Sequence, residues 1–210
     1  MPNSPISNRK SPSIVVMGVS GCGKSTVAEA FAQALNWPLF EGDVFHPALS
    51  IRKMSVGIAL TDDDRAGWLD HLAGLLAPRN DVNGIVLTCS ALRRKYRDRL
   101  RAGNSQLGFV FLELPYEAAL QRVQSRSGHF FTSALVADQF ATLESPVSEP
   151  DVLMVNAMDP IDVLTQQVVA WAQRSGWAPC DSTMTVGSLL MDSRNQTEPH
   201  KSEIWRTNCL

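Results

Sequence analysis

The stretch GVSGCGKST, residues 18–26, decides the fold that this chain can adopt. It contains the complete spacing G-x-x-x-x-G-K-S, follows the apolar run 14–17 and precedes a segment with apolar residues at helical spacing. A glycine-rich turn between a strand and a helix directs backbone N–H groups toward phosphate oxygens, and the helix start adds a favourable dipole. The stretch therefore predicts a nucleotide-binding P-loop; the alternative is a glycine-rich turn without a ligand.

The lysine and the serine of the P-loop motif each have their own chemical role. Lys24 is expected to reach the β- and γ-phosphates of ATP, and the Ser25 hydroxyl to ligate Mg²⁺. The predicted contacts within the loop are Gly18, Val19, Ser20, Gly21, Cys22, Gly23, Lys24, Ser25 and Thr26.

Short apolar runs alternate with helical patterns along most of the chain. The predicted strands are 14–17, 39–40, 85–88, 109–114 and 152–155. The predicted helices are 24–35, 62–76, 91–101, 116–125, 133–143 and 161–174. Strands without a polar face that alternate with helices indicate an α/β fold, a five-stranded parallel sheet with helices on both faces.

Length and composition indicate one folded domain with polar ends. The chain has 210 residues, of which 44% are hydrophobic, enough for one sizeable core. We expect residues 1–12 to form a disordered arm, 13–176 the P-loop kinase domain, and 177–210 a polar, disordered tail.

Several classes of protein are disfavoured by charge and patterning. A formal charge of −2 argues against nucleic-acid binding, which needs a surplus of Lys and Arg. No apolar stretch approaches the roughly 20 residues of a membrane span. The four scattered cysteines form no C-x-x-C pair, so neither disulfides nor a cysteine metal site is expected, and a cytoplasmic location fits best.

Asp43 is the candidate catalytic base, because it directly follows the second predicted strand in the sequence Glu41-Gly42-Asp43. In doubly wound sheets, the carboxyl ends of the strands line the ligand crevice. A carboxylate there can orient an acceptor hydroxyl and accept its proton during phosphoryl transfer. The alternative is an ordinary turn aspartate beside a glycine.

Two further helix starts carry polar residues toward the same edge. Thr61 and Asp64 have the spacing of a capping box, which leaves the basic Arg65 in the first turn unexplained. Ser90 follows the third predicted strand, where free helix N–H groups suit a substrate oxygen. Most charges of the basic helix after Ser90 are expected to form a solvated face.

Arg122 and Arg126 lie one helical turn apart, directly before Ser127 and Gly128. Such a pair, followed by a glycine hinge and a short helix, suits a mobile lid that closes over phosphates. The alternative is a surface helix that ends with Gly128 as its C-cap.

Together, the motifs GVSGCGKS, GDxxHP, KM, LTDDDR, CSALRRKYRDRLR and RSGHFFTSALVADQFATLESP closely resemble the gluconokinase family. These are small P-loop kinases related to shikimate and nucleoside-monophosphate kinases, and the resemblance covers residues 13–174. It implies ATP- and Mg²⁺-dependent phosphorylation of D-gluconate to 6-phosphogluconate, commonly by a homodimer. Members of the family usually carry Asn where this chain has Ser50 and Pro where it has Ala59.

The resemblance also implies roles for individual side chains. Asp43 would orient or deprotonate the acceptor hydroxyl, and Arg126 would act with Lys24 on the transition state, while Arg122 would hold the nucleotide. Gluconate would be bound by Asp43, His46, Lys53, Arg65, Ser90, Arg97 and His129. Two other functions stay open: a kinase for another small sugar acid, and a non-catalytic nucleotide-binding regulator, against which Asp43 and the paired arginines count.

Overall fold

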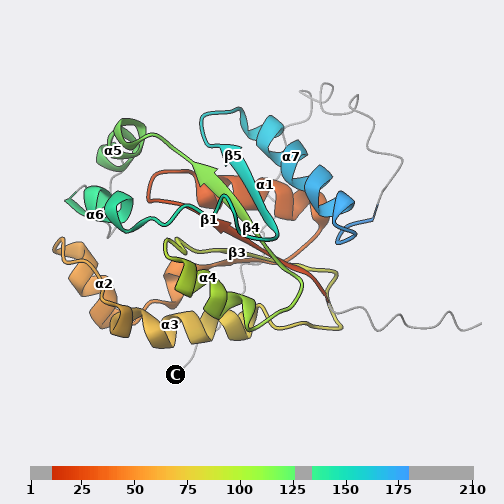
Figure 1. The fold of residues 1–210 in the computed structure, drawn as a ribbon, viewed down its shortest axis with the longest axis horizontal. Coiled ribbons are helices and arrows are strands. Elements are labelled where there is room, and N and C mark those ends of the chain that lie inside the picture. Colours follow the sequence, from red (N-terminus) through yellow and green to blue (C-terminus); the bar gives the residue numbers. More distant parts are fainter. Residues whose placement is uncertain (1–10, 126–133, 180–210) are drawn as a thin grey trace, which may run out of the picture. The chain divides into compact units, whose positions relative to one another are not determined.

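The computed structural model describes residues 11–125 and 134–179, and it is built on a five-stranded parallel sheet (Figure 1). The strands lie in the order β2-β3-β1-β4-β5. They are β1 (Ser13–Met17), β2 (Leu39–Glu41), β3 (Ile85–Thr88), β4 (Leu107–Glu113) and β5 (Val152–Asn156). The chain moves to one side of β1 for β2 and β3 and to the other side for β4 and β5, so the P-loop after β1 lies at the topological switch point, where α/β sheets bind ligands.

Helices cover both faces of the sheet, because the strands are apolar on both faces. The alternating side chains of β1 face two separate cores, Ile14 and Val16 in one and Val15 and Met17 in the other. In Figure 1, α1 and α7 lie on one face, and α3 and α4 on the other. The helices are α1 (Lys24–Leu35), α2 (Ala48–Ser55), α3 (Asp62–Leu75), α4 (Arg94–Arg101), α5 (Tyr116–Gln124), α6 (Ala134–Thr142) and α7 (Ile161–Arg174).

The predicted α/β fold is confirmed, with two differences in the helices. The short helix α2 was not predicted, because its buried face carries Ser50 and Met54 whereas Leu49 is 70% exposed. The helix predicted from residue 91 begins at Arg94. Ala91 has a left-handed backbone, with φ of 44°, which a helix cannot include. The predicted lid falls on residues 126–133, outside the described residues.

The packed domain extends slightly beyond its predicted end at residue 176. Trp177 and Ala178 pack on the core, and the Trp177 ring meets Trp171 edge to face with centroids 5.0 Å apart. A Cβ added at Gly108 would lie 2.4 Å from either ring, so β4 approaches these rings with its bare backbone. Residues 1–10 and 180–210 lie outside the described residues.

Gly42 joins β2 to the short 3-10 helix η1 (Gly42–Phe45) through close backbone contacts. Its N–H donates to Thr88 Oγ1 at 3.2 Å, and its carbonyl accepts from Trp68 Nε1 at 2.9 Å. A Cβ at this position would lie 2.2 Å from the Thr88 carbonyl oxygen. Only glycine therefore fits between β2 and Asp43 without a backbone shift.

Gly42→Ala is expected to lower the free energy of unfolding by about 1–3 kcal/mol, the typical cost of overpacking. Gly67 is the control, because it lies exposed in α3 with no atom within 4 Å of an added Cβ. Gly67→Ala is expected to raise the free energy of unfolding by about 0.5–1 kcal/mol through helix propensity. Urea unfolding measures both; equal effects of the two substitutions would contradict the packing described for Gly42.

Candidate active site

The P-loop turns from β1 into α1 through left-handed glycines. Gly18, Gly21 and Gly23 have φ of 141°, 85° and 94°, which side-chain-bearing residues rarely adopt. No side chain caps the start of α1, and its first turn carries no acidic residue. The loop and helix start therefore present backbone N–H groups to an anion, as predicted for a phosphate site.

The side chain of Lys24, the first residue of α1, folds back over the P-loop. Its Nζ donates to the Gly18 and Val19 carbonyls, each at 3.1 Å, and forms no ion pair with any residue in the described ranges. The ammonium is thus held over the loop by neutral acceptors. A phosphate, which carries a formal charge, would be a stronger acceptor than these carbonyls.

Glu41 joins the predicted metal ligand Ser25 at the end of β2. The Ser25 hydroxyl donates to Glu41 Oε2 at 3.1 Å, and the Thr88 hydroxyl donates to the same oxygen at 2.6 Å. A hydroxyl and a carboxylate are oxygen ligands of the kind that Mg²⁺ takes together with substrate phosphates. Glu41 was not among the predicted site residues; its position next to Gly42-Asp43 at a strand end was the signal.

One pocket opens beside the P-loop and gathers four of the seven predicted gluconate contacts together with two residues of the loop. They come from the P-loop, from η1 and the residue after it, from α3 and from the turn after β3. The pocket is lined by Ser20, Lys24, Asp43, His46, Met54, Ala59, Leu60, Arg65, Ser90, Leu135, Asp138 and Gln139. The carboxyl end of the sheet thus brings a P-loop lysine and a candidate acceptor site into one space.

Asp43 and Arg65 are both left available to a ligand. Neither forms an ion pair with a residue in the ranges that the structure describes, although each lines the pocket. Arg65 lies with its guanidinium carbon 5.8 Å from the centre of the Tyr96 ring. The predicted capping box is present, with Asp64 N donating to Thr61 Oγ1 at 3.2 Å, so the helix start is satisfied without Arg65.

His46 lines this pocket and has one buried nitrogen without a hydrogen-bond partner among the described residues. Its ring is 8% exposed and stacks on Trp68 with centroids 4.0 Å apart, and Nδ1 has no hydrogen-bond partner among the described residues. Burial lowers the pKa of His46 to about 4; nearby Asp43 opposes this shift, and Arg65 adds to it. The imidazole is therefore neutral at pH 7, and its free nitrogen suits a hydroxyl better than an anion.

The predicted contacts Lys53 and Arg122 lie outside this pocket lining. Lys53 Nζ is paired with Asp64 at 2.7 Å and so connects α2 to the cap of α3. Arg122, on α5, donates to the Gly21 and Ala157 carbonyls at 3.3 Å, which places it beside the P-loop. Arg126 and His129 lie outside the described residues.

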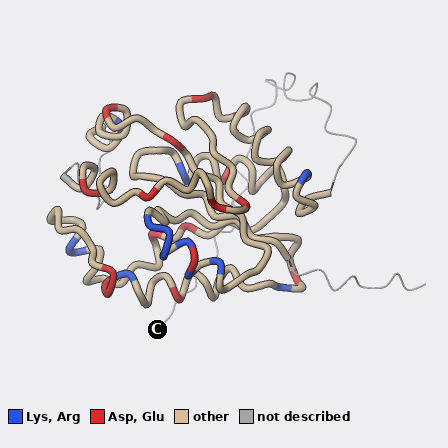
Figure 2. Tube along the Cα trace, viewed as in Figure 1, with Lys and Arg blue, Asp and Glu red and all other residues tan. Residues whose placement is uncertain are grey.

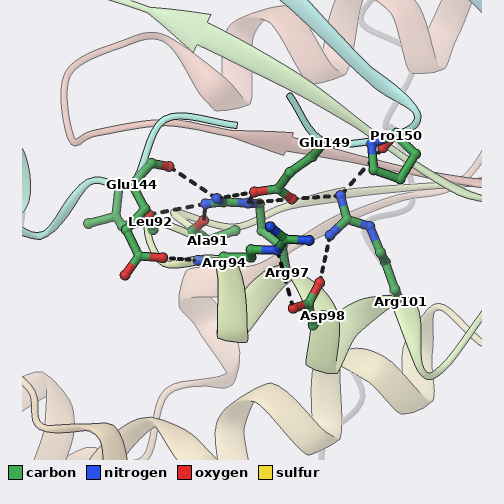
Figure 3. A network of polar contacts seen from close by, with 9 residues as sticks. All are labelled: Ala91, Leu92, Arg94, Arg97, Asp98, Arg101, Glu144, Glu149 and Pro150. Carbon is green, nitrogen blue, oxygen red and sulfur yellow. Dashed lines mark hydrogen bonds and ion pairs between the residues drawn. The ribbon is translucent and has the colours of Figure 1, made fainter. Parts of the chain in front are cut away.

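Arg97 is not brought to the pocket, contrary to the role that the resemblance implied for it. Its side chain is fully buried in the domain, where it binds both carboxylate oxygens of Glu149 (Figure 3). It also donates to the carbonyls of Ala91 at 2.8 Å, Leu92 at 3.1 Å and Glu144 at 3.0 Å. A guanidinium has five N–H donors, and these acceptors occupy them, so none is left for a substrate.

Figure 2 shows Lys and Arg gathered along α4, and most of the basic side chains there are partly exposed, as predicted. Arg93 and Lys95 pair with Asp62, and Arg99 pairs with Asp70 at 2.5 Å. These exposed pairs connect α4 to α3, each contributing about 0–1 kcal/mol. In the described ranges, no helix has the length and hydrophobicity that a membrane span requires.

Acidification is expected to destabilise the protein through His46. Its pKa is about 4 in the folded state and 6.5 ordinarily, so the unfolded chain takes up the proton more readily than the folded one. The free energy of unfolding is therefore at its full value above pH 6.5 and decreases as the pH falls toward 4. Between pH 7 and pH 4 this group alone is expected to remove about 3 kcal/mol from the free energy of unfolding. In urea unfolding, the free energy of unfolding of His46→Gln should fall between pH 7 and pH 4 by about 3 kcal/mol less than that of the wild type. An identical pH dependence of the two proteins would contradict the burial of a neutral imidazole.

Comparison with known proteins places this site in a family. The model of a family described as an AAA domain matches residues 14–149. A gluconokinase from Gluconobacter oxydans is 41% identical over 157 residues, which cover 74% of this chain and 88% of the relative. The crystal structure of a gluconokinase from Sinorhizobium meliloti is 45% identical and superposes with a TM-score of 0.71, covering 80% of this chain and 94% of that one.

A more distant neighbour shares the fold. Shikimate kinase from Aquifex aeolicus is 17% identical and has a TM-score of 0.52, over 78% of this chain and 98% of that one. The P-loop at the switch point and the sequence likeness over most of the relatives' length agree with the motifs identified in the sequence. The chain belongs to the gluconokinase family of P-loop kinases.

Proposed function

We propose that this protein transfers the γ-phosphoryl group of ATP to D-gluconate and forms 6-phospho-D-gluconate and ADP. The observation that carries the proposal is the single pocket in which Lys24 of the P-loop meets Asp43, His46 and Arg65. Its relatives named gluconokinase, at about 40% identity, support the choice of gluconate. The chemistry of the pocket gives each part of that substrate a partner.

The phosphate end of the reaction is assigned to the P-loop. Backbone N–H groups of the loop and of the start of α1 bind the phosphates, and Lys24 neutralises charge on the transferred group. Ser25 and Glu41 would hold Mg²⁺ with the phosphates, where the ion supplies charge neutralisation of the β- and γ-oxygens. Arg122 of α5 would contact the nucleotide from the other side of the loop.

The acceptor end is assigned to Asp43. Its carboxylate orients the C6 hydroxyl of gluconate and receives the hydroxyl proton as oxygen bonds to the γ-phosphorus. The bond between that phosphorus and the bridging oxygen breaks, and ADP leaves with the electron pair. Asp43 suits this role because it lines the pocket with Lys24 and forms no ion pair with the described residues.

The remainder of gluconate is assigned to Arg65, His46 and Ser90. Arg65 pairs with the substrate carboxylate, since it is the pocket cation left over once Lys24 has bound phosphate. The neutral imidazole of His46 and the hydroxyl of Ser90, two residues that line the pocket, bind hydroxyl groups along the chain. Ala59 lines the same pocket and Ser50 is buried in α2, so the two departures from the family pattern lie on the acceptor side.

The proposal extends to the residues outside the pocket and to the assembly and location of the protein. Lys53 acts through the cap of α3, while Arg126 and His129 contact phosphates and substrate from the lid. The folded unit is the kinase domain, and the protein functions in the cytoplasm as a homodimer. Transfer to another small sugar acid is the competing substrate assignment, and a panel of aldonates measured by ADP release separates the two.

Asp43→Asn is expected to lower kcat with gluconate by roughly 10²–10⁴-fold, because it keeps the shape of the side chain but removes its basicity. MgATP affinity and the melting temperature should remain near those of the wild type. Asp63→Asn is the control, since Asp63 is exposed in the first turn of α3. Coupled ADP release measures kcat; a value for Asp43→Asn close to that of the control would remove Asp43 from the mechanism.

Arg65→Gln is expected to lower kcat/KM for gluconate by roughly 10- to 100-fold, because a hydrogen bond to a charged group contributes about 1.5–3 kcal/mol. Activity with the neutral polyol sorbitol should stay unchanged, since sorbitol has no carboxylate to lose. Arg52→Gln, an exposed change on the neighbouring α2, serves as the control. An equal decrease in kcat/KM for gluconate and for sorbitol would show that Arg65 does not bind the carboxylate.

A further inference from the structure

Helix α6 reaches the P-loop through one buried side chain. Gln139 Oε1 accepts a hydrogen bond from the backbone N–H of Ser20 at 2.6 Å, and the Gln139 residue is 8% exposed. The two residues are 119 positions apart in the sequence, so the contact is made by the tertiary fold alone. Gln139 was not among the residues that the sequence singled out.

The Ser20 peptide lies at the part of the P-loop that faces the acceptor. Of the loop residues, Ser20 and Lys24 line the pocket that also contains Asp43. If ATP is the donor, as the proposed function states, this is where the γ-phosphoryl group meets the acceptor hydroxyl. The Ser20 N–H is thus part of the wall that surrounds the transferred group.

The end of α6 is fixed by a polar network that contains the buried Arg97 (Figure 3). Glu144, two residues beyond the helix, donates its N–H to Leu92 O at 2.8 Å and accepts from Arg94 N at 2.6 Å. Arg97 donates to the Glu144 carbonyl and pairs with Glu149. Burial acts to raise the pKa of Glu149, but hydrogen bonds from Arg97 and Arg101 outweigh it and hold the pKa below its usual value.

The start of α6 is fixed on the acceptor side of the pocket. Leu135 packs with Met54 of α2 and Leu60 of the following loop in a separate apolar cluster. The helix therefore spans the pocket from the acceptor-side elements to the P-loop, and both of its ends are held by named contacts. A helix held at both ends can place Gln139 with little freedom to move.

We propose that Gln139 is a positioning residue for phosphoryl transfer. It holds the Ser20 peptide of the P-loop in place around the γ-phosphoryl group, and Arg97 fixes the helix that carries it. Arg97 thereby serves the reaction from a buried position without touching the substrate.

The proposal predicts an effect on ATP that ADP does not share. Without the Gln139 carbonyl, the partly buried Ser20 N–H loses its acceptor, and a hydrogen bond of this kind contributes about 0.5–1.5 kcal/mol. That loss falls on the part of the loop that surrounds the γ-phosphoryl group. The β-phosphate, which ADP also carries, is bound by the rest of the loop and the start of α1.

Gln139→Met tests the proposal, because methionine keeps the length of the side chain and removes the strong acceptor. We expect Kd for MgATP to rise, and kcat/KM for ATP to fall, by roughly 2- to 13-fold, while Kd for ADP stays unchanged. Gln166→Met, on the exposed face of α7, is the control. Equal losses for ATP and ADP, or an ATP affinity equal to that of the control, would overturn the proposal.

Arg97→Lys tests the anchoring, since lysine keeps the charge but cannot reproduce the guanidinium contacts with the Ala91, Leu92 and Glu144 carbonyls. We expect the same preferential loss of ATP affinity, with an effect that is not additive with Gln139→Met in a double-mutant cycle. Arg99→Lys, an exposed change on the same helix, is the control. A lower melting temperature with unchanged ATP affinity would overturn the anchoring role.

The nucleotide titrations separate this inference from the proposed function. Wild-type protein that releases ADP with gluconate, together with a Gln139→Met variant of normal ATP affinity, would leave the proposed function standing and refute the role of Gln139. Wild-type protein that does not turn over gluconate would refute the substrate assignment, and the ratio of ATP to ADP affinity in the variant would still decide the role of Gln139.

Discussion

The turn between β1 and α1 is the constraint on which the rest of the site depends. It closes only with glycines in left-handed conformations, and it leaves the first N–H groups of α1 facing outward. Because β1 lies between β3 and β4, the turn sits where the chain changes sides of the sheet. Asp43 after β2 and Ser90 after β3 reach the same edge, so one parallel sheet brings donor and acceptor groups together.

The two cations of the pocket, Lys24 and Arg65, suit a substrate pair that is anionic at both ends. Lys24 and Arg65 are cations without ion-pair partners in the described ranges, whereas each basic residue around α4 is paired with an acid of α3, with Asp98 of α4 or with Glu149. Neutral His46 and the free carboxylate of Asp43 supply the groups that hydroxyls need. The charges around α4 are thus paired within the fold, whereas Lys24, Arg65 and Asp43 at the pocket have no ion-pair partner among the described residues.

Features with a local signature could be predicted from the sequence. The P-loop, the buried strands and the capping box of Thr61 and Asp64 each follow from neighbouring residues, and the structure contains all three. Features that rest on distant partners could not. Arg97 resembled its basic neighbours on α4, but its burial depends on Glu149, 52 positions away, and the contact between Gln139 and Ser20 spans 119 positions.

The pocket is proposed to direct the phosphoryl group to one particular hydroxyl of gluconate. Phosphorus NMR of a reaction that contains the protein, MgATP and D-gluconate tests it directly, because the coupling pattern of the new resonance identifies the carbon that bears the phosphate. We predict ADP together with a single phosphomonoester on C6. Release of inorganic phosphate alone, or a phosphate on a hydroxyl beside the carboxylate, would contradict the claim.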